Sequence, residues 1–140
     1  MDCVIDLSYC AGWFQPTQGH ADGVRVLKAH LAGELNLVCP ALWNYEVLNL
    51  LATATRRGTL TEAQADAGLD LLNALDVRIE ELATDAMRRR VHKFARQFKL
   101  TAYDAAYLEL ADRLQSPLLT RDEDLIAAAK QRGISVTLNT

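Results

Sequence analysis

The chain has 140 residues, of which 50% are hydrophobic and 24% charged, and its formal net charge is -3. These values predict one compact domain spanning residues 1–140, and the charge by itself does not indicate a polyanion binder. Three cysteines without a C-x-x-C pair argue against a zinc knuckle and a secreted disulfide framework. Because no signal-peptide pattern and no long apolar stretch is present, we expect a cytoplasmic protein without a membrane span.

The first predicted element is a short apolar strand at residues 3–6, which ends in the carboxylate of Asp6. Ser8, Gly12 and Pro16 follow it, and these residue types predict an irregular segment. Asp6 is therefore expected at the carboxyl end of a strand.

Apolar residues at helical spacing predict the next helix at 21–32, with Gly33 as its stop. A second strand is predicted at 35–38. The apolar pattern then predicts a longer helix over 41–57, which ends before Gly58.

A capping-box pattern of Thr61 and Gln64 opens a further helix that extends through Leu75. A short strand is predicted at 77–79. Apolar periodicity returns over 84–98 and predicts another helix there.

Thr101 has the pattern of a helix cap and places Asp104 in the first turn of the helix that follows. A strand at 117–120, a helix at 125–132 and a final strand at 136–138 complete the chain. This alternation predicts an α/β sandwich of three layers, with a mostly parallel sheet of four to five short strands between helices.

Four acids occupy places from which they can reach one edge of that sheet: Asp6, Glu46, Asp104 and Asp122. Sites in open α/β sheets form beyond the carboxyl ends of strands, and Asp6 and Asp122 each follow a strand. Carboxylates held close together repel one another unless a cation binds, and oxygen-only ligands favour Mg²⁺ or Mn²⁺, which suit phosphodiester hydrolysis. Because the chain has 18 acidic residues, surface acids without chemistry remain an alternative on spacing alone.

Four segments together resemble PIN-domain ribonucleases, especially the VapC toxins of bacterial toxin-antitoxin pairs. They are CVIDLSYCAGWF, PALWNYEVLNLL, TAYDAAYLELA and SPLLTRDEDL, in the order in which the family has them. The resemblance assigns metal-binding and catalytic roles to the same four acids, and a supporting hydroxyl to Ser8. Asp124 competes with Asp122 for the last role, and we prefer Asp122, with Asp124 as a helix-start charge.

This resemblance implies a parallel sheet flanked by helices and cleavage of RNA by an endonuclease that depends on Mg²⁺ or Mn²⁺. It also implies a homodimer and a cognate antitoxin as protein partner. Two alternatives stay open, namely a binding module of the same fold without catalysis and a solitary RNA-processing nuclease without an antitoxin. A phosphatase of the haloacid dehalogenase type is disfavoured because Ser8 replaces its second acid.

Other residues are assigned supporting roles or none. Ser8, Asn49 and Thr120 are candidates for orienting the carboxylates, although Ser8 and Thr120 could equally satisfy backbone groups at strand ends. Tyr103 and Tyr107 flank Asp104 at helical spacing, and we assign them no chemistry because such tyrosines commonly cover apolar surface.

A run of basic residues lies in the helix predicted at 84–98. Arg90, Lys93 and Arg96 step by three, which keeps them near one helical face, and we predict that they bind RNA phosphates. The alternative is a solvated helix surface without a ligand.

Overall fold

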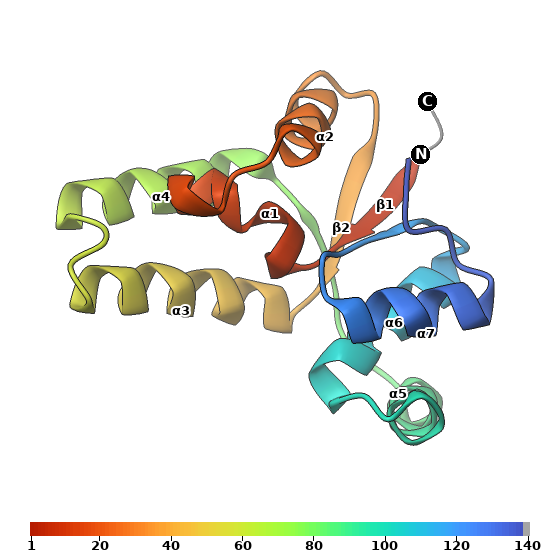
Figure 1. Cartoon of the computed structure of the whole chain (residues 1–140). Coiled ribbons are helices and arrows are strands. Elements are labelled where there is room, and N and C mark those ends of the chain that lie inside the picture. The colour runs from red at the N-terminus through yellow and green to blue at the C-terminus, as the bar shows by residue number, and fades with distance from the viewer. Residues whose placement is uncertain (139–140) are drawn as a thin grey trace.

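The computed structural model describes residues 1–138 and contains a parallel sheet at its centre (Figure 1). The sheet has the order β3-β2-β1-β4, and its strands are β1 (Asp2–Ile5), β2 (Asn36–Pro40), β3 (Arg78–Glu80) and β4 (Leu118–Leu119). Every neighbouring pair is parallel, and Val4 of β1 lies between Val38 and Leu118. The predicted parallel sheet is confirmed, with four strands.

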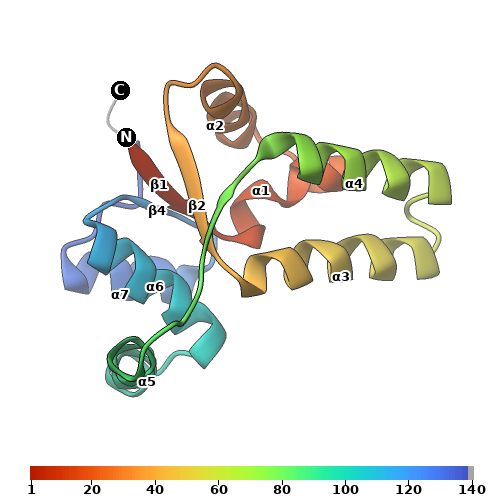
Figure 2. The same ribbon diagram turned by 180° about the vertical axis from the view of Figure 1, so that it is seen from behind.

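Helices cover both faces of the sheet. They are α1 (Leu7–Phe14), α2 (Ala21–Leu31), α3 (Leu42–Arg56), α4 (Glu62–Leu75), α5 (Asp85–Phe98), α6 (Ala102–Leu114) and α7 (Glu123–Arg132), with a 3-10 turn η1 (Pro16–Gln18) after α1. Figures 1 and 2 show α1 to α4 on one side of the sheet and α6 and α7 on the other, with α5 packed outside α6. The predicted three-layer α/β sandwich is therefore confirmed.

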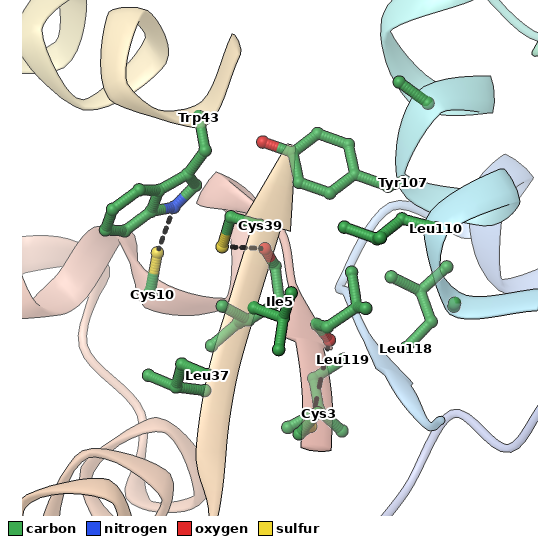
Figure 3. Close-up of a cluster of buried hydrophobic side chains, with 14 of the residues drawn as sticks. Cys3, Ile5, Cys10, Leu37, Cys39, Trp43, Tyr107, Leu110, Leu118 and Leu119 are labelled. Atoms are coloured by element: carbon green, nitrogen blue, oxygen red, sulfur yellow. Dashed lines mark hydrogen bonds between the residues drawn. The ribbon is translucent and has the colours of Figure 1, made fainter. Parts of the chain in front are cut away.

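The core explains why these segments take these places. β1 is apolar and fully buried at Cys3, Val4 and Ile5, as expected for a strand covered on both faces. Between sheet and α1 to α4, the Trp43 indole N–H donates to Cys10 Sγ over 3.5 Å, and the Cys39 thiol donates to the Ile5 carbonyl over 3.2 Å (Figure 3). The first contact joins α3 to α1, and the second joins β2 to β1.

The segment after β1 differs from the prediction, because α1 forms where irregular structure was expected. Asp6 caps this helix and accepts from the Tyr9 backbone N–H over 3.2 Å, so the helix begins directly at the strand end. Gly12 lies inside it, where an added Cβ would come within 2.3 Å of Gly19 Cα. The glycine therefore permits a close backbone approach and does not end the helix.

The strand predicted at 136–138 is wrong, since these residues form no strand in the structure. The Ser135 hydroxyl donates to the Thr137 carbonyl over 2.8 Å and accepts from the Thr137 N–H over 3.4 Å. These local bonds occupy backbone groups that a fifth strand would pair with the sheet. Elsewhere, no helix within residues 1–138 is long and apolar enough to cross a membrane.

Candidate active site

A pocket of about 260 Å³ opens where the starts of α1, α6 and α7 and the first turns of α3 meet at the carboxyl edge of the sheet. It contains all four acids proposed from the sequence. Its lining consists of Asp6, Leu7, Ser8, Ala11, Gln18, Glu46, Asp104, Tyr107 and Asp122. Residues 116 positions apart in the chain thus face one cavity.

Three of the acids sit at helix starts, and this local structure explains how they are held. Asp6 caps α1, and Asp122 caps α7 by accepting from the Leu125 N–H over 2.8 Å. Asp104 lies in the first turn of α6, and its own N–H donates to the hydroxyl of the cap, Thr101, over 3.1 Å. The positive ends of three helix dipoles therefore point at the pocket and favour negative charge there.

Asp6 is nearly buried, at 6% exposure, and both of its oxygens accept from hydroxyl groups. The Ser8 hydroxyl donates to Oδ1 over 2.6 Å, and the Thr120 hydroxyl donates to Oδ2 over 2.5 Å. In turn, the Arg121 N–H donates to Ser8 Oγ and the Asp122 N–H donates to Thr120 Oγ1, over 2.8 and 3.1 Å. The structure therefore brings Ser8 and Thr120 to Asp6 and fixes the orientation of its carboxylate.

Glu46 of α3 is held by a residue that the sequence analysis left without a role. The Tyr107 hydroxyl donates to Glu46 Oε1, and the Tyr107 side chain is only 1% exposed. Figure 3 shows its ring extending from α6 toward α3. The available signal was its position three residues after Asp104, which places both on one face of α6. Asn49, by contrast, is exposed and does not line the pocket.

Burial and mutual repulsion both act on the pocket acids. Burial raises the pKa of the Asp6 carboxyl, bonds from Ser8, Thr120 and Tyr9 lower it, and Asp122 raises it. Burial likewise raises the pKa of Glu46 and of Asp104, and neighbouring carboxylates raise both further. Within residues 1–138, none of the four acids forms an ion pair with Lys, Arg or His. The fold concentrates negative charge here without a cation of its own.

The donor set fits a hard divalent cation, because every acidic group in the pocket offers carboxylate oxygen and the lining contains no His or Cys. In the described part of the chain, no three Asp, Glu, His or Cys side chains already form a cluster for one ion. The Asp104 carboxylate makes no hydrogen bond there, so it has both oxygens available as ligands.

The basic residues proposed to bind RNA lie outside the pocket, on α5. Arg90 faces α6, where its guanidinium bonds Asp112 over 2.7 Å and approaches Glu109 to 3.5 Å. Lys93 and Arg96 are exposed. The structure therefore separates Arg90 from the other two.

Comparison with known proteins gives a family and several relatives. The model of the PIN domain family matches residues 4–131. Ribonuclease VapC3 of Mycobacterium tuberculosis is 32% identical over 125 residues, which cover 89% of this chain and 85% of that protein. Ribonuclease VapC3 of Pyrobaculum aerophilum is 32% identical over 135 residues, covering 89% and 92%, and Ribonuclease VapC1 of M. tuberculosis is 32% identical over 127 residues, covering 91% and 90%.

Solved structures share the fold. The crystal structure of PAE2754 from P. aerophilum matches with a TM-score of 0.72 at 24% identity and covers 97% of this chain and 84% of that one. M. tuberculosis VapC20, described as a toxin that cleaves the sarcin-ricin loop, matches with a TM-score of 0.64 at 14% identity and covers 98% and 99%.

Proposed function

This chain belongs to the PIN-domain family, and we propose that it is an endoribonuclease that hydrolyses RNA phosphodiester bonds with the help of Mg²⁺ or Mn²⁺. The observation that carries the proposal is the convergence of four acids, without a cationic partner in residues 1–138, on one pocket. Relatives named ribonucleases, at 32% identity over most of the chain, support the reaction class.

In this proposal Asp6, Glu46, Asp104 and Asp122 would hold the metal, which would activate a water and stabilise the leaving oxygen. Asp6 is kept in one orientation by its bonds from Ser8 and Thr120. Tyr107 acts as a positioning residue for Glu46, because its buried hydroxyl donates to one of the two carboxylate oxygens. The lining contains no Cys, His or Lys, and its Ser8 and Tyr107 hydroxyls donate to Asp6 and Glu46, so water is the nucleophile in this proposal.

The same relatives support a finer proposal, in which the enzyme is the toxin of a VapBC-type pair. It acts in the cytoplasm as a homodimer, and a cognate antitoxin inhibits it. Two alternatives to the toxin are a solitary RNA-processing nuclease of the same fold and a binding module without catalysis, and the experiments below distinguish them.

The test of activity is incubation of the purified protein with total cellular RNA, followed by mapping of new RNA ends. We expect discrete cuts with Mn²⁺ or Mg²⁺ and none with EDTA, because the pocket acids then lack their counterion. Asp104→Asn serves as the inactive control. Cutting that persists in EDTA, or equally in the variant, would contradict the metal-dependent assignment, and no cutting under any condition would favour the binding module.

The toxin proposal is tested in cells. Induced expression is expected to arrest growth, and co-expression of the small protein encoded beside it is expected to restore growth. Arrest without such relief would favour the solitary nuclease, whereas Asp104→Asn should cause no arrest at all.

A further inference from the structure

The outward face of α5 carries a cluster of cations that the proposed metal chemistry does not use. We call this cluster the α5 basic face, and it consists of Arg88, Arg89, His92, Lys93 and Arg96. Together with Gln97 these side chains line a shallow surface concavity, and all of them are exposed. The opposite face of the helix packs Val91 and Phe94 into the core, so the helix is strongly divided into a buried apolar side and a solvent side.

The fold supplies almost no counterion for the α5 basic face. Asp85 is the only acid of α5, and it bonds Arg89 over 2.7 Å. Within residues 1–138, Arg88, Lys93 and Arg96 form no ion pair at all. Like charges one helical turn apart repel, so the arrangement lowers helix stability slightly unless an anion binds. A helix surface that binds no ligand gains no stability from cations gathered on one side.

The position of the helix relates this face to the pocket. α5 ends at Phe98, and Thr101, three residues later, caps the helix whose first turn carries Asp104. Figures 1 and 2 both show α5 on that side of the sheet, beyond α6. The pocket itself is acidic and repels phosphate groups, so a polyanionic substrate needs cations outside it.

We infer that the α5 basic face binds the sugar-phosphate backbone of the RNA segment that flanks the cleaved bond, an inference that rests on the proposed function. From Arg88 to Arg96 the helix rises by about 12 Å, which corresponds to roughly three or four phosphates at about 3.4 Å per phosphate of a duplex strand. Contacts to phosphates carry no base information. The face therefore supplies affinity for the RNA backbone, and the choice of cut site lies elsewhere.

A binding assay separates this inference from catalysis. In the Asp104→Asn background with EDTA present, a labelled RNA hairpin is titrated between 50 and 200 mM salt, and binding is followed by fluorescence anisotropy. The test pair is Lys93→Gln with Arg96→Gln. The control pair is Arg56→Gln with Arg57→Gln, which removes the same charge from exposed residues at the end of α3.

We expect the test pair to weaken binding about tenfold at 50 mM salt and to reduce the slope of log K against log salt by roughly 1.4 to 1.8, for two lost phosphate contacts. The control pair should stay within about twofold of the background. Glutamine retains helix propensity, and a thermal melt of each variant verifies the fold. Equal effects of the two pairs, or no measurable binding in EDTA, would overturn the inference.

The two proposals fail in different ways. If the wild-type protein cuts RNA but the test pair binds as the control pair does, only the α5 assignment is lost, and an acidic protein segment becomes the better ligand for this face. If the test pair loses binding while the wild-type protein cuts nothing, the endonuclease proposal is lost and the backbone-binding face remains.

Discussion

The two ends of α6 hold carboxylates in opposite ways. Near its start, Asp104 faces the pocket without a cation, and burial raises the pKa of its carboxyl. Near its end, Asp112 bonds Arg132 over 2.9 Å and Arg90 over 2.7 Å, and the bonds from these guanidinium groups lower the pKa of its carboxyl. The same helix therefore carries one acid that the fold neutralises and one that it does not.

Burial alone does not explain this difference. Glu109 is only 1% exposed, yet Arg113 bonds it over 2.9 Å and Arg90 lies within 3.5 Å. Asp6, at 6% exposure, has only hydroxyl and amide donors among residues 1–138. Buried charges are ordinarily paired, so an acid without a cation among residues 1–138 is what the proposed metal site requires. The contrast separates acids that the fold pairs with arginines from the acids of the proposed site.

The largest expected effect is on RNA cleavage, when each of the two α6 acids is replaced separately by asparagine. Asp104→Asn should lower RNA cleavage by at least about a hundredfold, because a charged metal ligand becomes a neutral amide. Asp112→Asn should leave the cleavage rate within a few fold. Rates measured on one defined RNA under saturating Mn²⁺ check both, and similar losses in the two variants would break the comparison.

Metal binding should stabilise the protein through the pocket acids alone. At a Mn²⁺ concentration about a hundred times its dissociation constant, the free energy of unfolding should rise by roughly 2.7 kcal/mol. Thermal melts with and without EDTA measure the shift. Asp112→Asn is expected to retain it and Asp104→Asn to lose most of it, whereas a shift that survives in Asp104→Asn would place the metal elsewhere.

The pH dependence of stability should have opposite signs in the two regions when EDTA is present. A raised carboxyl pKa, as at Asp6, Glu46 and Asp104, contributes stability below the unfolded value of about 4, and this contribution is lost as pH rises through the folded value. The lowered pKa of Asp112 contributes stability above its unfolded value, and this is lost as pH falls through the folded value. Urea unfolding between pH 3 and 8 measures both effects. As pH rises, the free energy of unfolding should decline less in Asp104→Asn than in the wild-type protein. At acid pH it should fall less in Asp112→Asn than in the wild-type protein.

Tyr107→Phe tests whether the Tyr107 hydroxyl contributes to metal binding by orienting Glu46. Removing its bond leaves Glu46 without a fixed orientation, so Mn²⁺ affinity measured by calorimetry should fall about tenfold. Tyr103→Phe, on the same helix at 68% exposure, is the matched control. Equal Mn²⁺ affinity in the two variants would leave Tyr107 a packing residue.

The smallest effect is expected on stability at the far end of α6. Asp112→Asn should lower the free energy of unfolding by about 1 kcal/mol at pH 7, because the two guanidinium partners stay close to solvent. Urea unfolding measures it. A loss as large as that of a fully buried ion pair would mean that this cluster supports the fold more than its exposure indicates.

Features encoded locally could be predicted from the sequence. The capping box of Thr61 and Gln64 is present, Gly133 ends α7, and Thr101 caps α6. The pocket acids each follow a strand or lie in the first turns of a helix, but among 18 acidic residues the resemblance of four motifs was needed to choose them. Their meeting in one pocket follows from parallel topology, in which carboxyl ends share one edge.

Features that depend on distant contacts could not be predicted. Gly12 permits α1 because the chain returns beside it at Gly19, which no local rule for glycine includes. Tyr107 gained its role from a glutamate 61 positions away, and Arg90 is drawn to Asp112, 22 positions away. Spacing by three along a helix cannot show which side faces the neighbouring helix.

Asp6 and Asp122 have two duties, since each also accepts the backbone N–H that begins a helix. Replacement by alanine would therefore remove a cap, at a cost of about 1 kcal/mol, together with any chemistry, whereas asparagine keeps the cap. An alanine scan would make these positions look more catalytic than they are. It also follows that unfolding either helix start would displace a pocket acid. On the proposed function, an inhibitor that binds beside the acids and unwinds a helix start would therefore lower activity without contacting the acids.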